Sequence, residues 1–198
     1  ALAVARLDAV DSWTNHKMAL VGPKGSGKSH LAHVWAEATG GAVMALADMQ
    51  DADEVNVNTP LAVEVSDSFE PETENTLFHL HNHMAAVLLP FLMITRAPPA
   101  RWPLVLPDLK SRMEATDLVQ IGPPDAALLA AVLVKQFADR QLHVAPSLIA
   151  WMTKRMDRSF AEAQRLVAEC DAAALAQGRP INRTLAQHIL DNAPNSTP

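Results

Sequence analysis

The sequence predicts an α/β protein, in which a five-stranded parallel sheet flanked by helices is followed by a smaller all-helical unit. Short apolar runs alternate with helix-like stretches through the first 121 residues, which is typical of strands joined by crossover helices. A glycine-rich phosphate-binding motif follows the first run, and after Ile121 only helical patterns remain. We therefore expect two domains, at residues 1–121 and 122–198.

The apolar runs are predicted to be the strands of the sheet. They are short and are separated by polar or turn-forming segments, as expected for buried strands. The runs are residues 18–21, 42–47, 61–66, 90–95 and 117–121.

Helix-like stretches connect these strands. The first is predicted over residues 28–39 and ends at the glycine pair 40–41, because glycine commonly ends helices. A second helical pattern covers residues 72–89 and stops before a proline. Residues 48–60 are polar and acidic without periodicity, which predicts a connecting loop. Apolar spacing within residues 2–10 predicts an N-terminal helix beside the first strand.

The second domain begins with the turn GPPD at residues 122–125. Asp125 is predicted to cap the helix that follows, because its carboxylate can accept a hydrogen bond from the first turn. The helical segments expected in this domain are residues 125–140, 146–154, 158–177 and 182–191.

The motif G-x-x-x-x-G-K-[ST] lies between the first strand and the first helix. Glycines let backbone N–H groups point at a phosphate, Lys28 adds a positive charge, and the Ser29 hydroxyl can bind Mg²⁺. The helix also directs the positive end of its dipole at the anion. We therefore predict a nucleotide-binding loop with Ser29 as the metal ligand. Its residues are Gly22, Pro23, Lys24, Gly25, Ser26, Gly27, Lys28, Ser29 and His30.

A carboxylate at the end of a neighbouring strand normally helps to order the magnesium ion and to activate the attacking water. In LAVEVSDSF the candidates are Glu64 and Asp67, depending on where the strand ends, and no adjacent Asp-Glu pair is present. The alternative is that Glu64 is an outward-facing carboxylate on a strand near the edge of the sheet. Nucleotide binding is therefore better supported than hydrolysis.

Two arginines are candidates for contact with a phosphate. Arg112 precedes the fifth strand in a predicted loop, from which an exposed guanidinium could reach a γ-phosphate held by another subunit. Arg158 stands at the start of a helix of the second domain and could cover the nucleotide of its own chain. The alternative for each is a solvated surface arginine, and the basic residues around Arg158 favour that alternative there.

Composition limits the classes of partner. A net charge of −6 disfavours a surface that neutralises many phosphates of duplex DNA. The single cysteine, Cys170, excludes a disulfide framework and suits a reducing compartment. No apolar run approaches the ~20 residues of a membrane-spanning helix. We therefore expect a cytoplasmic protein without direct duplex DNA or membrane binding. Because the first residue is alanine, the sequence leaves open whether its N-terminus is trimmed.

Over nearly its whole length the chain resembles the DnaA family of AAA+ proteins. The segments that carry the resemblance are, in order, GPKGSGKSHLAHVW, LMITRAPPARW, LPDLKSRM, GPPD and DRSFAEAQRLV. The phosphate-binding motif is widespread, but T-R-A-P-P followed by L-P-D-L-x-S-R is far more restricted. The chain looks like the AAA+ module of the bacterial replication initiators. It is similar, more closely still, to the shortened Hda-type regulators, which act with the sliding clamp to promote hydrolysis of the initiator's ATP.

The resemblance implies a AAA+ sheet domain with a helical lid, ADP or ATP with Mg²⁺ as ligands, and roles for particular residues. Thr95 matches the sensor position near the γ-phosphate, and Arg112 matches the family's arginine finger. Arg158 is the nearest match to the sensor arginine of the lid, although an ungapped alignment puts Ala161 there instead. The family's strand-end aspartate falls on or beside Val65, which puts hydrolysis by this chain in doubt.

The resemblance also implies the DnaA initiator and the DNA polymerase sliding clamp as partners. Initiators carry a C-terminal helix-turn-helix that reads DNA, whereas here APNSTP follows Asn192, so we expect a regulator. The clamp-binding peptide of the regulators has no match before Ala1. Self-association, and the choice between ADP and ATP, are left open.

Three functional interpretations follow. In the first, the nucleotide is a structural ligand and Arg112 completes the active site of an ATP-loaded initiator. The second is a free-standing ATPase of the helicase-loader type, acting on DNA or a helicase ring, which needs a competent strand-end carboxylate and a basic channel. The third is a nucleotide-binding interaction module with no hydrolytic outcome.

The histidines and tryptophans are interpreted as structural. His79 and His83 share a helix face, but His81 points elsewhere and no third metal ligand lies nearby in the sequence, so a polar contact surface is favoured over a metal site. The four tryptophans, which are predicted to pack in the core, are Trp13, Trp35, Trp102 and Trp151.

Overall fold

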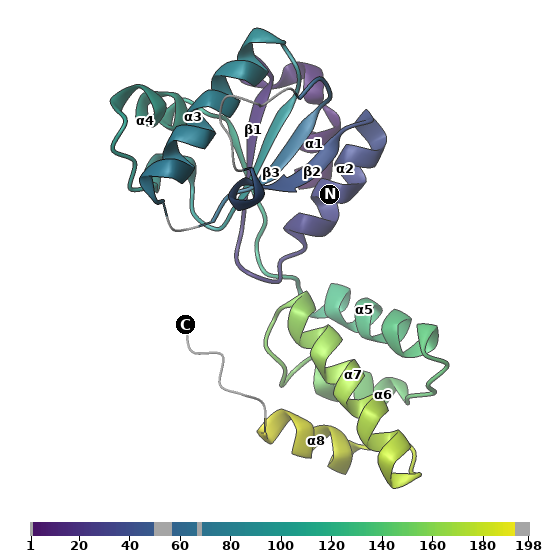
Figure 1. Ribbon diagram of the computed structural model, residues 1–198. Coiled ribbons are helices and arrows are strands. Elements are labelled where there is room, and N and C mark those ends of the chain that lie inside the picture. Colours follow the sequence, from purple (N-terminus) through teal and green to yellow (C-terminus); the bar gives the residue numbers. More distant parts are fainter. Residues whose placement is uncertain (1, 50–56, 67–68, 193–198) are drawn as a thin grey trace. The chain divides into compact units, whose positions relative to one another are not determined.

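The computed structural model describes residues 2–49, 57–66 and 69–192 (Figure 1). Part of the predicted loop at 48–60, and the candidate carboxylate Asp67, lie outside the described residues. Within the described residues, no helix is both long enough and apolar enough to cross a membrane.

The chain forms two compact units. The first, called the sheet unit below, comprises Ala1–Pro23 and Gly27–Gly122. The second, called the helical unit, comprises Lys24–Ser26 and Pro123–Pro198. Buried side chains cluster on both faces of the sheet in the first unit and between the helices in the second.

The sheet unit is built on a five-stranded parallel sheet with the strand order β2-β3-β4-β1-β5 (Figure 1). The strands are β1 (Lys17–Val21), β2 (Ala42–Ala45), β3 (Leu61–Glu64), β4 (Phe91–Thr95) and β5 (Leu118–Gln120). The predicted fold class is confirmed, and each strand lies within a predicted run or extends it by one residue. Val21 pairs with Thr95 and Glu64 pairs with Ile94. The carboxyl ends of β1, β3 and β4 therefore meet at one edge of the sheet.

Within the described residues, helices flank both faces of this sheet (Figure 1). Helices α1 (Leu2–Asp8) and α2 (Lys28–Thr39) cover one face, and α3 (Pro71–Ala86) and α4 (Pro107–Glu114) cover the other. Short 3₁₀ turns lie at Val10–Ser12, Thr14–His16, Leu46–Asp48 and Pro99–Arg101. Helix α2, which begins with Lys28 of the phosphate-binding motif, and α4, which contains Arg112, therefore both belong to the sheet unit but cover opposite faces of the sheet.

Alternation along the strands explains the two layers of helices. Successive residues of a strand point to opposite faces, so a parallel strand buried on both faces is apolar throughout. In β4, Phe91 and Met93 join the cluster under α3 and α4, whereas Leu92 and Ile94 join the cluster under α1 and α2. All five residues of β4 are buried.

Helix α4 corrects the expectation of a loop before the fifth strand. Pro107 occupies the first turn, where its missing N–H costs nothing, and Asp108 follows in the same turn. Leu109 and Met113, four positions apart, are both buried under this helix. Arg112 consequently lies in the last turn of a packed helix rather than in a loop.

The helical unit contains α5 (Ala126–Asp139), α6 (Pro146–Met152), α7 (Phe160–Gln177) and α8 (Arg183–Asp191). Side chains cap three of these helices, as their sequences suggest. Asp125 accepts a hydrogen bond from the Leu128 N–H (2.7 Å), Ser159 from the Glu162 N–H (3.0 Å) and Asn182 from the Leu185 N–H (3.0 Å). Because Ser159 is a cap, α7 begins two residues later than predicted.

The tryptophans and the cysteine mostly occupy the cores, as predicted. Trp13 and Trp35 stack at 5.7 Å between ring centroids in the cluster under α1 and α2, and Trp102 is buried under α3 and α4. Trp151 is only half-buried, beside the core of the helical unit. Cys170 is fully buried, and burial raises the pKa of its thiol to about 11, so it is an inert core residue.

Candidate functional site

The phosphate-binding motif forms the loop between β1 and α2. Gly25 and Gly27 adopt left-handed backbone conformations, with φ of 73° and 88°, which residues with a side chain rarely adopt. Gly27 is the N-cap of α2, and Lys28 is its first residue. The first N–H groups of a helix have no partner within it, so those of α2 are available to an anion at this point.

Lys28 lies inside this loop. Its ammonium group donates to the carbonyl oxygens of Gly22 (2.7 Å) and Pro23 (2.8 Å), and the residue is only 9% exposed. The positive charge is thus held within the backbone turn that would surround a phosphate. An anion in the loop would attract the ammonium away from these two neutral carbonyls.

The hydroxyl of Ser29 donates a hydrogen bond to Oε1 of Glu64, at 2.5 Å. Glu64 is the last residue of β3, a strand that lies between β2 and β4 rather than at the edge of the sheet. Of the two carboxylates left open by the sequence, Glu64 therefore stands beside the predicted metal ligand, while Asp67 lies outside the described residues. A hydroxyl and a carboxylate oxygen at one point suit Mg²⁺, which often uses few protein ligands together with phosphate oxygens.

Thr95 and Ser26 complete the surroundings of the loop. Thr95 ends β4, is buried, and donates its hydroxyl proton to the Ala97 carbonyl oxygen (2.9 Å). Its own carbonyl oxygen accepts from the N–H of Gly22 (3.2 Å), which links the end of β4 to the loop. Ser26 is 4% exposed, and its hydroxyl has no hydrogen-bond partner among the described residues. A buried hydroxyl of this kind fits a polar ligand in the loop.

Arg112 is held by two other residues of the sheet unit. One terminal nitrogen, Nη1, donates to Oδ1 of Asn82 at 2.5 Å, and Nη2 donates to Oδ2 of Asp108 at 2.8 Å. The ring of Phe78 lies 5.8 Å from the guanidinium carbon. The Arg112 side chain is 37% exposed, so it is paired but reachable from solvent. The expected loop position is therefore wrong, and the expected exposure of the guanidinium is partial.

Arg112 lies far from the phosphate-binding loop of its own chain. Its charge is felt by Lys17, the first residue of β1, whereas the loop follows Val21, the last residue of that strand. A five-residue strand is about 13 Å long. His81 contacts Lys17, and the next residue, Asn82, accepts a hydrogen bond from Arg112, so the guanidinium lies toward the end of β1 opposite to the loop.

Lys17 and His81 form a buried basic pair behind Arg112. Nζ of Lys17 lies 2.8 Å from Nε2 of His81, and the two residues are 6% and 4% exposed. Burial, with a further contribution from Arg112, lowers the pKa of Lys17 from 10.5 to about 8. Burial, followed by the charges of Lys17 and Arg112, lowers the pKa of His81 from 6.5 to about 4. At neutral pH a protonated Lys17 therefore donates to a neutral His81.

The other two histidines of α3 do not join this pair. Nε2 of His83 lies 2.8 Å from the Val57 carbonyl oxygen, and His79 is exposed with its ring edge against Phe78. No group of three or more potential metal ligands occurs among the described residues.

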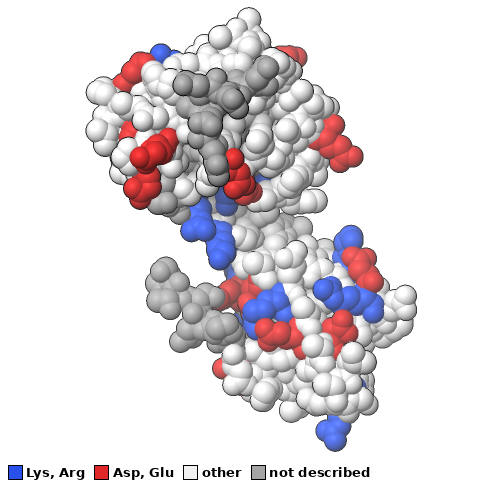
Figure 2. Space-filling view, viewed as in Figure 1, with Lys and Arg blue, Asp and Glu red and all other residues white. Residues whose placement is uncertain are grey.

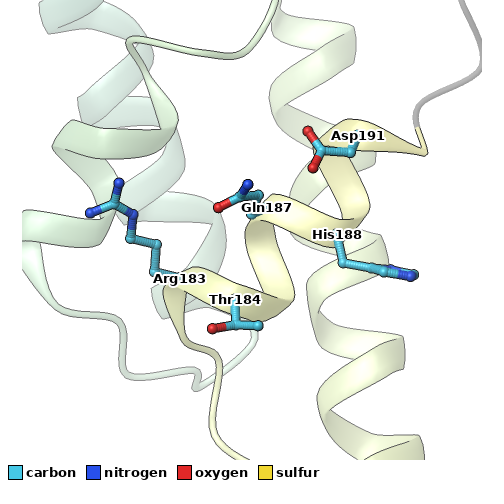
Figure 3. A pocket seen from close by; sticks show the side chains of 5 residues that line it. All are labelled: Arg183, Thr184, Gln187, His188 and Asp191. Carbon is cyan, nitrogen blue, oxygen red and sulfur yellow. The ribbon is translucent and has the colours of Figure 1, made fainter.

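The two candidate positions of the lid sensor lie in the helical unit. Arg158 is exposed in the turn immediately before the N-cap of α7, and Ala161 is exposed in the first turn of that helix. A shallow surface pocket of this unit lies elsewhere, on α8, and none of the predicted site residues lines it. The side chains around it extend to different sides of α8 rather than toward a common point (Figure 3). They are Arg183, Thr184, Gln187, His188 and Asp191.

Reasoning from sequence missed three of these residues. Asp108 lies four positions before Arg112, a spacing that would have identified the ion pair once a helix was recognised. No local signal identifies Asn82 or Lys17, because each meets its partner across the sheet unit.

The chain shows a limited similarity to curated proteins, among them a replication initiator of the DnaA type. No protein-family model matches the sequence. The chromosomal replication initiator protein DnaA of Cutibacterium acnes is 25% identical over 119 residues, which is 60% of this chain and 24% of that protein. The match therefore spans about a quarter of the relative's length.

Solved structures define the fold. Domain III of the Thermotoga maritima replication initiation protein DnaA has a TM-score of 0.77 and 14% identity, over 96% of this chain and 90% of that one. AMPPCP-bound DnaA from Aquifex aeolicus has a TM-score of 0.69 and 16% identity, over 98% and 68% of the two chains. The FIGL-1 AAA domain in complex with ADP has a TM-score of 0.72 and 12% identity, over 100% and 79%. The sheet with its flanking helices thus has the AAA+ ATPase fold.

Proposed function

We propose that this chain is an adenine-nucleotide-binding AAA+ regulator that promotes ATP hydrolysis on the replication initiator DnaA, with Arg112 supplied in trans. In this proposal the loop from Gly22 to His30 would hold ADP or ATP, and Ser29 would hold Mg²⁺ with the carboxylate of Glu64 nearby. The nucleotide is mainly a structural ligand, and the hydrolysed ATP belongs to the initiator. Regulation of this kind lowers the amount of ATP-loaded initiator and thereby restrains initiation of replication.

The loop supports the nucleotide part of the proposal. Its glycines have left-handed φ values, Lys28 is held within the turn, and Ser29 meets Glu64. The bound nucleotide would supply phosphate oxygens for the N–H groups of α2, for the Lys28 ammonium and for the metal ion. Thr95 and Arg158 are proposed as its sensor residues, with Ala161 as the alternative position in the lid. Two similar solved proteins are complexes with AMPPCP and with ADP.

The position of Arg112 is the main support for a regulatory role in trans. The guanidinium is partly exposed, and it lies toward the opposite end of β1 from the chain's own loop. An arginine in this position can stabilise transition-state charge only on a phosphate held by another molecule. The initiator is proposed as that molecule because the chain is similar to DnaA proteins in sequence and fold.

The test is initiator-dependent ATP hydrolysis with purified components. ATP-loaded DnaA is mixed with the sliding clamp on DNA and with this chain, and phosphate release is followed over time. Because a trans arginine is worth about 10³–10⁵ in rate, Arg112→Ala should abolish the stimulation. Lys110→Ala is the matched control, since it removes an exposed charge from the same helix without touching Asn82 or Phe78.

Both variants are checked by circular dichroism and by nucleotide affinity, which should stay close to those of the parent chain. Full stimulation by Arg112→Ala would overturn the trans mechanism. Omitting the clamp tests that partner separately, because the proposal expects stimulation to depend on it. Self-association is read from light scattering in the same buffers.

A second function, an ATPase of the helicase-loader type, is favoured by one observation. The Ser29 hydroxyl donates to Glu64, so a strand-end carboxylate does stand beside the proposed metal ligand. If this chain hydrolyses its own ATP, turnover by the purified chain should be measurable without any initiator and should be lost in Glu64→Gln. Turnover that persists in Glu64→Gln, or that is absent from the parent chain, counts against this alternative.

A further inference from the structure

Side chains of α3 contact α4 and the segment just before it, and both helices lie on the same face of the sheet (Figure 1). Glu74, Phe78 and Asn82 follow each other at intervals of four, so they form a single stripe on α3. Oε1 of Glu74 accepts from the N–H groups of Val105 (2.8 Å) and Leu106 (2.6 Å), immediately before α4. The stripe therefore fixes the start of α4 as well as Arg112 near its end.

Asn82 and Asp108 hold Arg112 in different ways. Asp108 lies on the same helix as Arg112, its side chain is 61% exposed, and its charge partly neutralises the guanidinium. Asn82 lies on the neighbouring helix, which is anchored to the sheet by Leu77, Leu80 and Met84. Its amide oxygen fixes Nη1 without adding negative charge. Asn82 therefore ties the guanidinium to the sheet while leaving its positive charge intact.

The remaining donors of Arg112 are directed at no other described residue. A guanidinium has five N–H donors in a fixed plane, and the hydrogen bonds to Asn82 and Asp108 use two of them. Phe78 supports one side of this plane at 5.8 Å. Behind it, the protonated Lys17 repels a second cation, which opposes collapse of the guanidinium into the sheet unit. The group is thus oriented, positively charged and open to phosphate oxygens.

We propose that Asn82 is a positioning residue for Arg112, setting the orientation in which the guanidinium is presented to a phosphate of another molecule. This inference rests on the proposed function, because it assigns a task to Asn82 only if Arg112 acts in trans. Asn82 itself touches neither the initiator nor its nucleotide. Its hydrogen bond keeps the Arg112 side chain in one rotamer, so the guanidinium is already oriented when the other molecule binds.

The experiment titrates the chain against a fixed amount of ATP-loaded DnaA and separates the maximal rate from the concentration that gives half of it. Asn82→Ala should lower the maximal rate about 10- to 100-fold, because a misplaced catalytic group loses rate by factors of this size. The half-saturating concentration should stay within a factor of two, since Asn82 does not bind the partner. Asn82→Gln retains a neutral amide oxygen that can accept from Nη1 without adding negative charge, and it should recover part of the maximal rate.

Two controls keep the outcomes separate. Thermal unfolding shows whether Asn82→Ala remains folded, and Lys110→Ala reports the loss of an unrelated charge from α4. If Arg112→Ala is inactive but Asn82→Ala stimulates fully, the positioning role is overturned while the proposed function stands. The positioning role is equally overturned if Asn82→Gln falls as far as Asn82→Ala, or if only the half-saturating concentration changes. If Arg112→Ala stimulates fully, the proposed function itself fails.

Discussion

At the scale of single residues, Lys17 and His81 combine two basic groups in the interior of the sheet unit. No ion pair joins either side chain to a carboxylate of the described residues, and the nearby charges are those of Arg112 and, more weakly, Asp108. Burial disfavours the charged form of both groups. Near pH 5 the same two side chains in water would both be protonated, whereas in the folded protein only Lys17 is. The pair is thus stable only while His81 stays neutral.

Acid should therefore weaken the protein through His81. The folded-state pKa of about 4 lies below the ordinary value of 6.5, so the unfolded chain binds more protons between these two pH values. Unfolding free energy consequently falls as the pH drops through this window. We expect His81→Gln, which keeps an acceptor for Lys17 but does not titrate, to have a shallower pH dependence than the parent chain. Urea unfolding at several pH values between about 7 and 4 measures the difference, and parallel curves would contradict it.

At the scale of secondary-structure elements, α3 organises the neighbouring helix. Leu106, the N-cap of α4, has no side chain that can cap the helix, and the buried carboxylate of Glu74 takes over this task from another element. Glu74 is 5% exposed, so its two hydrogen bonds are largely shielded from water. A carboxylate near the positive end of a helix is also favoured by the helix dipole. The position of Arg112 thus depends on a contact made at the other end of α4.

Removing the Glu74 carboxylate should destabilise the sheet unit. Hydrogen bonds to a charged group contribute about 1.5–3 kcal/mol, so Glu74→Ala is expected to lower the unfolding free energy by ~2–3 kcal/mol. Glu72→Ala is the matched control, because Glu72 is exposed in the first turn of the same helix. Its effect should stay within about 0.5 kcal/mol. Equal losses in the two variants, measured by urea unfolding, would show that the cap contributes nothing specific.

At the scale of the whole molecule, the two units differ in charge. The sheet unit carries 15 Asp and Glu against 7 Lys and Arg, whereas the helical unit carries 7 against 9. On the face shown in Figure 2, acidic and basic side chains are interspersed in the helical unit rather than gathered into one basic patch. The net negative charge of the sheet unit therefore does not attract an anion to the proposed nucleotide loop. The attraction must come from local donors, which are the backbone N–H groups and Lys28.

Nucleotide should stabilise the folded chain through these local donors. A ligand that binds only the folded state adds about 2.7 kcal/mol at a free concentration of 100 times its Kd. We expect ADP or ATP with Mg²⁺ to raise the midpoint of thermal unfolding by several degrees, and Lys28→Ala to lose this increase. Lys135→Ala, at an exposed lysine paired with Asp139 on α5, should keep it. The comparison uses the shift caused by nucleotide, so a change in the starting midpoint does not affect it. An equal shift in the Lys28 and Lys135 variants would argue against the loop as the binding site.

Sequence patterns identified the parts of the site that are continuous in the chain. The phosphate-binding motif requires a turn between a strand and a helix, and the structure has β1 and α2 on its two sides. The segment around Arg112 is a helix, although its pattern predicts a loop. Only two apolar residues, Leu109 and Met113, show helical spacing there, and Pro107 is the main sign of a helix start. For the strand-end acid, the sequence left two registers open. The position of Glu64 beside Ser29 follows from the pairing of β3 with its neighbours.

The sequence by itself determined the α/β class, the order of the five strands and the loop between β1 and α2, because apolar periodicity, glycines and caps act over a few neighbouring residues. Only the tertiary structure decided which side chains meet. Ser29 and Glu64 are 35 positions apart, Asn82 and Arg112 are 30 apart, and Lys17 and His81 are 64 apart. Such pairs depend on the register of the sheet and on the packing of α3 against α4, and these are set by the burial of whole faces rather than by any local pattern.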